Sequence, residues 1–385
     1  MLYRKFGKCD FQVSTLGYGC MRLPIIDGDE GKINVKESIR LIRSAIDQGV
    51  NYIDTAYPYH KGMSEILVSK ALKDGYREKV KLATKLPSWL VNTYEDFDRL
   101  LNEQLKKLET DHIDCYLLHS LGKFSWNKIK DLGVIKFVEA ALKDGRIKHI
   151  GFSFHDELPL FKEIIDAYPW DFCQIQYNFM DENYQAGTEG LEYAAAKGMA
   201  IIVMEPLRGG KLTKNPPDEV KAIWNLAEVK RTPAAWALKW IYNNPRITTV
   251  LSGMGKMEEV LENIEIAGTS LPNTLTQKEI NLIDMVKEKY KTFTKIGCTS
   301  CGYCMPCPSG VAIPNNFNLY NEAFIYNNVE PSKFSYDRFM TDQSRASGCI
   351  DCGQCEGLCP QNLPIRVHLK EVHNLLKKEV HKLSR

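Results

Sequence analysis

The chain has 385 residues, of which 44% are hydrophobic and 25% charged, and its formal net charge is +2. This composition is typical of globular proteins and excludes collagen-like and disordered chains. Because basic and acidic residues nearly balance, we expect neither a nucleic acid nor a membrane surface as a partner. No apolar stretch approaches about 18 residues, and the N-terminus has no apolar signal-peptide core, so we expect a cytoplasmic protein.

Short apolar runs alternate with amphipathic stretches up to about residue 290. The runs are mostly rich in β-branched or aromatic residues, which is typical of buried strands. We predict strands at Leu16–Cys20, Tyr52–Thr55, Val80–Lys85, Ile113–His119, Ile147–Ser153, Phe172–Gln176, Ala200–Glu205 and Ile247–Ser252.

Helical patterns occupy the intervals between these strands. Val35–Gln48 and Glu95–Leu108 each place apolar side chains on one helix face. Glycines stand where helices of this kind would end, at Gly49, Gly75, Gly145 and Gly198. Strands that alternate with helices in this way predict an α/β protein with a parallel (β/α)₈ barrel, the TIM-barrel fold.

An open doubly wound sheet is the alternative arrangement of the same elements. It would place a glycine-rich dinucleotide-binding loop after the first strand. Gly17 and Gly19 supply two of the glycines, but Arg22 stands in place of the third. The fingerprint is therefore incomplete, and we interpret the chain as a barrel, whose chemistry would lie at the C-terminal ends of the strands.

Three consecutive strands place ionisable side chains at that end. Asp54 ends the second strand and is followed by Tyr59, while Lys85 and His119 end the third and fourth strands. An ammonium beside a tyrosine lowers the pKa of its hydroxyl, which is otherwise about 10, and a carboxylate would hold that ammonium. A histidine can hydrogen-bond the substrate oxygen, so the set predicts a proton-donating site. Singly, each residue also has a structural interpretation, such as a core histidine, a solvated lysine or a turn cap.

Further segments around these residues resemble the aldo-keto reductase superfamily in order and spacing. They are Asp54-Thr55-Ala56-x-x-Tyr59, Gly62-x-x-Glu65, Thr84-Lys85, Leu117-Leu118-His119, Ile150-Gly151-Phe152-Ser153, Gln174-Ile175-Gln176-Tyr177-Asn178, Pro206-Leu207-Arg208-Gly209-Gly210 and Glu262-Asn263.

The resemblance implies an oxidoreductase that interconverts a small-molecule carbonyl and an alcohol with NAD(H) or NADP(H). Tyr59 would be the general acid, Lys85 and Asp54 would tune it, and His119 would orient the carbonyl. Three pairs would contact the cofactor: Ser153 and Gln174 at the nicotinamide, Gly209 and Gly210 at the pyrophosphate, and Glu262 and Asn263 at the adenine.

The chain departs from the family's pattern at several cofactor positions. Phe154 replaces a common asparagine, and Met204 replaces an aromatic ring that stacks on the nicotinamide. Many members bind the 2′-phosphate of NADPH with a Lys-Ser pair and an arginine, where this chain has Gly253, Met254 and Glu259. Because a glutamate repels a phosphate, we expect NADH to be used at least as well as NADPH, although Lys256 could compensate.

Eight of the 12 cysteines follow residue 297 and form two groups. The second group, Cys349, Cys352, Cys355 and Cys359 before Pro360, has the C-x₂-C-x₂-C-x₃-C-P spacing of bacterial 4Fe–4S ferredoxins. The first group has one residue fewer before its last cysteine and comprises Cys298, Cys301, Cys304 and Cys307.

In such a pair of motifs the fourth cysteine of each group ligates the other cluster. We therefore expect Cys359 to join the first three cysteines of the first group, and Cys307 to join those of the second. Two structural zinc sites are the alternative, since Zn²⁺ also accepts four thiolates. Zinc sites more often pair separate C-x₂-C knuckles, and the trailing proline also favours two 4Fe–4S clusters.

This tail resembles helical ferredoxin-type domains, in which helices separate the two motifs. Helices are predicted near Asn316–Asn327, Lys333–Gln343 and Pro364–Leu383, the last one amphipathic. The expected domains are a barrel at 1–290 and a small, mostly α-helical iron–sulfur domain at 291–385.

The relation between the two halves is open from the sequence. A nicotinamide moves two electrons as hydride and a cluster moves one, and no flavin motif is found to bridge them. The clusters would exchange electrons with the barrel or with an electron-transfer protein, or the tail would be structural or redox-sensing beside an independent reductase. Alternatively, the barrel would serve as a docking scaffold. Three loop aromatics either line a substrate pocket or pack on the surface: Trp89, Phe124 and Trp126.

Overall fold

The computed structural model describes residues 1–298, 302–359 and 361–377. The chain forms two compact units. The barrel unit comprises Met1–Gly209 and Ala234–Thr276, and the tail unit comprises Gly210–Pro233 and Gln277–Arg385. The segment 210–233 therefore groups with the tail although it lies within the barrel's sequence, and the boundary expected at residue 290 stays a prediction.

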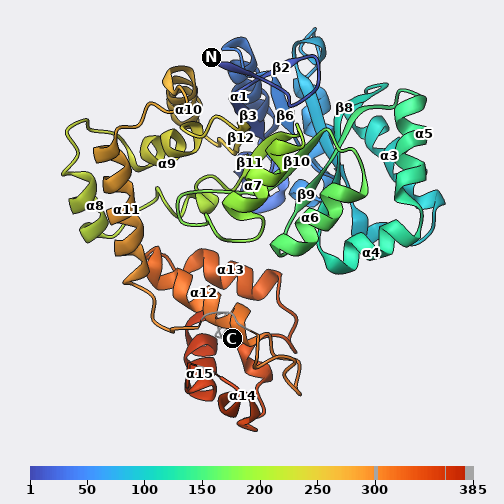
Figure 1. The fold of residues 1–385 in the computed structure, drawn as a ribbon. Coiled ribbons are helices and arrows are strands. Elements are labelled where there is room, and N and C mark those ends of the chain that lie inside the picture. The colour runs from blue at the N-terminus through green and yellow to red at the C-terminus, as the bar shows by residue number, and fades with distance from the viewer. Residues whose placement is uncertain (299–301, 360, 378–385) are drawn as a thin grey trace, which may run out of the picture. The chain divides into compact units, whose positions relative to one another are not determined.

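Eight parallel strands close into a barrel in the order β10-β11-β12-β3-β6-β7-β8-β9 (Figure 1). The predicted barrel is therefore confirmed, and each predicted strand is present with its ends shifted by two residues or fewer. The strands are β3 (Leu16–Gly19), β6 (Tyr52–Asp54), β7 (Lys81–Leu86), β8 (Ile113–Leu121), β9 (Ile147–Phe154), β10 (Phe172–Gln176), β11 (Ala200–Met204) and β12 (Ile247–Ser252).

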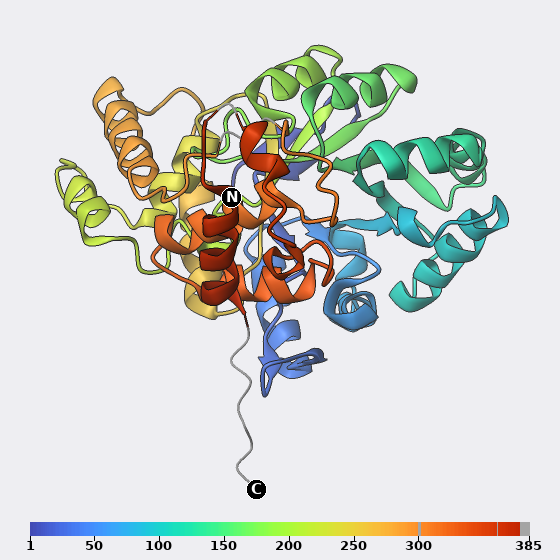
Figure 2. The ribbon, with the colours of Figure 1, turned by 90° about the horizontal axis from the view of Figure 1, so that it is seen from below.

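Helices surround the strands, and Figure 2 shows them around the rim in chain order, from blue through cyan to green. They are α1 (Val35–Asp47), α2 (Ser64–Ala71), α3 (Glu95–Leu108), α4 (Lys123–Asp131), α5 (Val134–Lys143), α6 (Leu158–Ala167), α7 (Gly187–Ala196), α9 (Pro233–Tyr242) and α10 (Met257–Thr269). The sequence determines their ends locally. The Asn34 side chain accepts a hydrogen bond from Glu37 N at the start of α1, and Gly49, just past its end, has a φ of +97°.

Two antiparallel hairpins were not predicted from the sequence. β1 (Tyr3–Lys5) pairs with β2 (Gln12–Ser14), and β4 (Ile25–Ile26) pairs with β5 (Asp29–Ile33). Their strands are short and partly exposed, so they lack the apolar run that marks a buried strand. The first hairpin contributes Phe6 and Val13 to a core cluster with Tyr52 and Phe172 of the barrel.

The tail unit is helical. It contains α8 (Asp218–Trp224), α11 (Gln277–Lys291), α12 (Ile313–Ile325), α13 (Glu330–Arg338), α14 (Gln354–Gly357) and α15 (Ile365–Leu376). Helices lie at all three places expected in the tail, although α13 ends at Arg338 instead of Gln343, and residues 378–383 of the last expected helix lie outside the described residues. α12 and α13 begin three residues earlier than expected, each with a proline in its first turn, where its missing N–H costs no hydrogen bond.

A separate apolar core holds the tail together. It is built around α12 and α15 and includes Ile296, Phe317, Leu369 and Val372. Several of the motif cysteines pack against this core. Over the residues described here, no helix has the length and apolar character needed to cross a bilayer.

Candidate functional site

The four residues expected to form a proton-donating site are brought together at the C-terminal ends of β6, β7 and β8. Lys85 Nζ lies 2.7 Å from Asp54 Oδ1 and also donates to the Thr55 carbonyl at 2.7 Å. The two charged side chains are only 0% and 3% exposed. Lys85 Nζ is 5.0 Å from the centroid of the Tyr59 ring, and the Tyr59 and His119 rings are 6.1 Å apart. These distances make one compact polar site.

Burial controls the ionisation of this site. It raises the pKa of Tyr59 above its ordinary value, and the Lys85 ammonium opposes the shift without cancelling it. The pKa of Tyr59 is therefore raised overall, although Lys85 lowers it as expected from the sequence. Burial, aided by Lys85, holds the pKa of His119 well below its ordinary value. Tyr59 thus keeps its proton near neutral pH, and His119 is a neutral imidazole.

A buried hydrogen-bond network packs against the β7 end of this candidate site. The Glu65 carboxylate accepts hydrogen bonds of 2.7 Å from Thr84 Oγ1 and from Gln104 Nε2. Gln104 also donates to the Lys85 carbonyl and accepts from the Tyr116 hydroxyl. Glu65 and Thr84 belong to the quoted motifs, whereas Gln104 was missed because it lies on α3 among helix-forming residues with no distinctive spacing.

One of the three loop aromatics lies at this site. The Trp89 ring is 5.1 Å from the His119 ring and 46% exposed, so it can cover part of a substrate. Phe124 is 93% exposed. For Trp126 both alternatives, pocket lining and surface packing from a loop, are wrong, because it is buried in α4, where it packs on Trp170.

The residues expected at a nicotinamide lie on adjacent strands. Ser153 is on β9, where its hydroxyl accepts from Ser120 N at 2.7 Å, and Gln174 is on β10. Within the described chain, neither Gln174 Oε1 nor His119 Nδ1 has a hydrogen-bond partner, although both atoms are buried. A buried polar atom without a partner is costly, so these two atoms fit a ligand that carries an amide and a carbonyl.

The loop after β11 carries the two glycines expected at a pyrophosphate. Gly209 and Gly210 have φ values of +66° and +87°, which favour glycine. A Cβ atom on Gly209 would lie 3.0 Å from the Arg22 guanidinium, which itself pairs with Glu205 at 3.1 Å. This Arg22–Glu205 pair was missed, because the two residues are 183 positions apart in the sequence.

The residues expected at an adenine lie on α10, which follows β12. Asn263 is buried and donates to Ser252 Oγ at 3.0 Å, and Glu262 is half-buried next to it. Glu259, one turn earlier, accepts a hydrogen bond of 2.8 Å from Gly255 N. This contact fixes the Glu259 carboxylate against the loop that joins β12 to α10.

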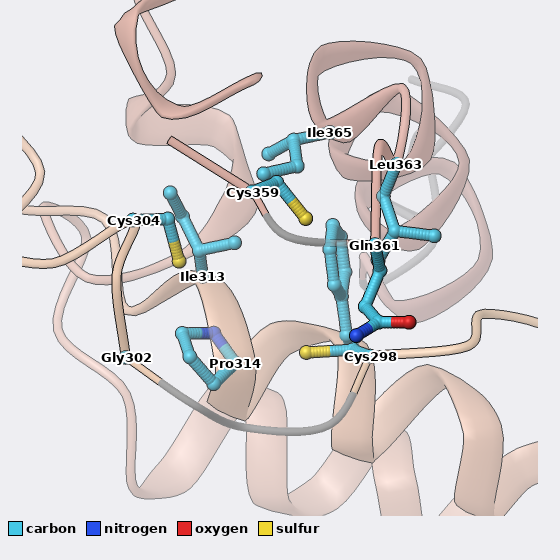
Figure 3. Close-up of a pocket in the computed structure, with 10 residues that line it drawn as sticks. Cys298, Gly302, Cys304, Ile313, Pro314, Cys359, Gln361, Leu363 and Ile365 are labelled. Carbon is cyan, nitrogen blue, oxygen red and sulfur yellow. The ribbon is translucent and has the colours of Figure 1, made fainter. Parts of the chain in front are cut away.

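Three motif cysteines line one hollow of the tail. Figure 3 shows the sulfur atoms of Cys298, Cys304 and Cys359 directed into a space lined by apolar side chains such as Ile313 and Leu363. Cys301, expected to share this site, lies outside the described residues.

The remaining motif cysteines line a second hollow, together with Cys304. They are Cys307, Cys349, Cys352 and Cys355. Burial alone would raise the pKa of the Cys307 thiol. The Ser309 hydroxyl and the N–H groups of Ser309, Gly310 and Val311 outweigh burial and lower it. Thiols gathered from both groups around partly apolar hollows fit the ligand chemistry of iron–sulfur clusters.

Comparisons with known proteins agree with both halves of the chain. The Aldo/keto reductase family matches residues 15–288, and the 4Fe-4S dicluster domain matches residues 297–363. Over 318 residues, the chain is 26% identical to the L-galactose dehydrogenase of Arabidopsis thaliana, which covers 76% of this chain and 96% of the relative. The "Uncharacterized oxidoreductase YqkF" of Bacillus subtilis is 25% identical over 312 residues, covering 74% and 95%.

A solved structure of an aldo-keto reductase also matches the barrel half of the chain. The holo form of the aldo-keto reductase AKR11C1 from Bacillus halodurans matches with a TM-score of 0.62 and 26% sequence identity. The match covers 74% of this chain and 96% of the other. The chain therefore belongs to the aldo/keto reductase family and is an oxidoreductase that carries a C-terminal 4Fe-4S dicluster domain.

Proposed function

We propose that the barrel interconverts a small-molecule carbonyl and an alcohol with NADH or NADPH, and that the tail holds two 4Fe–4S clusters for electron transfer, either with the barrel or with an electron-transfer protein. The observation that carries this proposal is the buried Lys85–Asp54 pair, with an Nζ to Oδ1 distance of 2.7 Å, beside Tyr59 and His119. A charged pair without solvent is costly to maintain, and its position next to a tyrosine hydroxyl suits proton transfer.

Each residue has a defined part in this reaction. Tyr59 donates its proton to the carbonyl oxygen, and Lys85 stabilises the phenolate that remains. Asp54 fixes Lys85, and the neutral His119 donates a hydrogen bond to the same oxygen. Gln174 and Ser153 would hold the carboxamide of a nicotinamide, which supplies the hydride when bound.

The expected ligand sets cross between the two cysteine groups. Cys298, Cys304 and Cys359 line one hollow, which supports a first cluster held by them and by Cys301. The second cluster would be held by Cys307, Cys349, Cys352 and Cys355, which line the other hollow. A reducing compartment such as the cytoplasm would keep these thiols available as ligands.

A pair of tyrosine variants tests the barrel reaction. Tyr59→Phe should lower kcat/KM for carbonyl reduction by about 10²–10⁴-fold, the usual loss of a general acid. Tyr57→Phe is the matched control, since its hydroxyl donates to Glu103, on α3. A Tyr59→Phe enzyme with wild-type activity would contradict the proposed reaction and would favour a barrel that acts as a docking scaffold.

Anaerobic titration tests the electron transfer. NADH and then NADPH are added to the purified protein while the visible absorbance of the clusters is recorded. Bleaching is expected, and the more effective nucleotide is the preferred one. Clusters that bleach with dithionite but with neither nucleotide would contradict exchange with the barrel and leave an independent reductase.

A further inference from the structure

Three side chains of metal-binding type, Cys9, His149 and Asp171, lie together at the N-terminal end of the barrel strands, the end opposite the Tyr59 site. Cys9 is in the turn between β1 and β2, His149 is near the start of β9, and Asp171 directly precedes β10. Cys9 Sγ is 3.5 Å from His149 Nδ1, which is 3.3 Å from Asp171 Oδ2. One ligand atom from each residue can be chosen so that all three lie within 4.8 Å of one another.

The two distances from His149 Nδ1 match the edges of a tetrahedral zinc site. Zinc binds a thiolate at about 2.3 Å and imidazole nitrogen or carboxylate oxygen at about 2.0–2.1 Å. At the tetrahedral angle, a sulfur and a nitrogen ligand are then about 3.5 Å apart, and a nitrogen and an oxygen about 3.3 Å. The observed Cys9–His149 and His149–Asp171 distances are 3.5 and 3.3 Å. A thiol, an imidazole and a carboxylate are also the donor types that zinc accepts.

The three side chains are held in place by their surroundings. The His149 ring packs on the Phe11 ring with a centroid distance of 4.9 Å. Ile150 N donates to Asp171 Oδ2 at 3.3 Å. Cys9 is almost fully buried, whereas the His149 and Asp171 side chains are 27% and 21% exposed, so water can reach a fourth position.

Some of the groups around these three side chains favour a bound cation, and others oppose it. Burial and the Asp171 carboxylate raise the pKa of the Cys9 thiol to about 11, so the thiol is protonated near neutral pH. Burial opposes ionisation of Asp171, but His149 and the Ile150 N–H outweigh it and lower the pKa of this carboxyl. Lys8 Nζ, 4.0 Å from Asp171, opposes a cation.

We propose that Cys9, His149 and Asp171 bind a zinc ion that ties the β1–β2 hairpin to the starts of β9 and β10. When the Zn–S bond forms, the Cys9 thiol releases its proton to solvent. The His149 ring binds through Nδ1 in the tautomer that carries its proton on Nε2, so the zinc bond replaces the contacts of Nδ1 with Cys9 and Asp171. The carboxylate binds as it is, and water completes the coordination without any change of oxidation state. The ion stabilises the closed N-terminal end of the barrel.

Metal content tests the site directly. The purified protein with its clusters is dialysed anaerobically against zinc sulfate, and zinc and iron are measured in the same sample. The wild type should retain one more zinc ion per chain than Cys9→Ala and His149→Gln, with equal iron in all three proteins. Lys8→Gln is the matched control, since it removes a nearby positive charge and leaves all three ligands. It should bind zinc at least as tightly as the wild type.

A second measurement does not depend on the variants. Zinc should raise the midpoint of thermal unfolding of the wild-type barrel, because an ion that binds only the folded state stabilises it. Wild-type protein that retains no zinc, or retains as much as both ligand variants, would overturn the site. Reductase activity should not change in any of these proteins, since none of the altered residues belongs to the Tyr59 site.

Discussion

At the scale of single residues, burial and charge oppose each other, and charge prevails at Lys85 whereas burial prevails at Tyr59. Lys85 keeps its proton although burial alone would lower its pKa, because the Asp54 carboxylate raises it. The same ammonium lies close to Tyr59, yet burial still raises the pKa of this hydroxyl. In the proposed reaction, Tyr59 would therefore begin as a protonated acid, and Lys85 would stabilise the phenolate that remains.

The neutral state of His119 predicts a dependence of stability on pH. Its folded-state pKa lies well below the ordinary 6.5, so the unfolded chain binds a proton that the native chain does not as the pH falls below about 6.5. Stability from this group is present above that pH and is lost in acid, by up to about 1.4 kcal/mol per pH unit. Chemical denaturation at several pH values should show a smaller acid loss for His119→Gln. Identical pH profiles for both proteins would contradict a neutral buried histidine.

Glu259 predicts the cofactor preference. Its carboxylate is fixed by Gly255 N, at the position where the family resemblance leads us to expect an arginine that binds a 2′-phosphate. Glu259→Arg should shift the ratio of kcat/KM values toward NADPH by about tenfold or more, since a charged hydrogen bond is worth about 1.5–3 kcal/mol. Glu258→Gln, on the exposed neighbour, should leave the ratio unchanged. Strong NADPH selectivity in the wild type would refute this role of Glu259.

At the scale of elements, periodicity predicted what is local. The strands and α1 and α3 follow from runs of side chains that are buried on one or both faces, and their ends agree with the structure to two residues or fewer. The two hairpins were not predicted, because pairing partners, not apolar runs, define β1 and β4. Membership of 210–233 in the tail unit was also unpredictable, since it depends on contacts with distant helices.

Several ion pairs join this segment to the rest of the tail unit, and one of them lies near the start of the segment. Lys211, directly after the glycines expected at the pyrophosphate, lies 2.5 Å from Glu322 on α12, and the two side chains are 18% and 10% exposed. Lys211→Met should destabilise the tail unit by about 2–4 kcal/mol, because it removes the ammonium of a largely buried ion pair. It should also raise KM for the nicotinamide cofactor by loosening the glycine loop.

The control for this prediction is an exposed pair in the same unit. Lys333 pairs with Glu330 at 3.5 Å on the surface of α13. Lys333→Met should change stability by less than about 1 kcal/mol and leave KM unchanged. Equal effects of the two substitutions on unfolding in denaturant would show that Lys211 has no special anchoring role.

At the scale of the whole molecule, sequence motifs predicted which cysteines lie together. Contacts between residues that belong to no motif became visible only in the structure. The spacing of the cysteines predicted two crossed sets, and the described members of each set line a common hollow. The Glu65–Gln104 network and the Cys9 cluster combine residues from distant elements in no recognisable pattern. Each half has a core of its own, which carries a final prediction.

Removal of iron should destabilise the tail unit and leave the stability of the barrel unchanged. The tail core is small, and several of the cluster cysteines pack against it, so without its clusters this unit loses part of its interior. The barrel core contains none of these cysteines. Anaerobic chelation should therefore lower the unfolding temperature of the tail unit and leave the barrel transition and carbonyl reduction with added NADH unchanged. Loss of reductase activity in step with iron, while calorimetry still shows the barrel transition, would mean instead that the clusters take part in turnover.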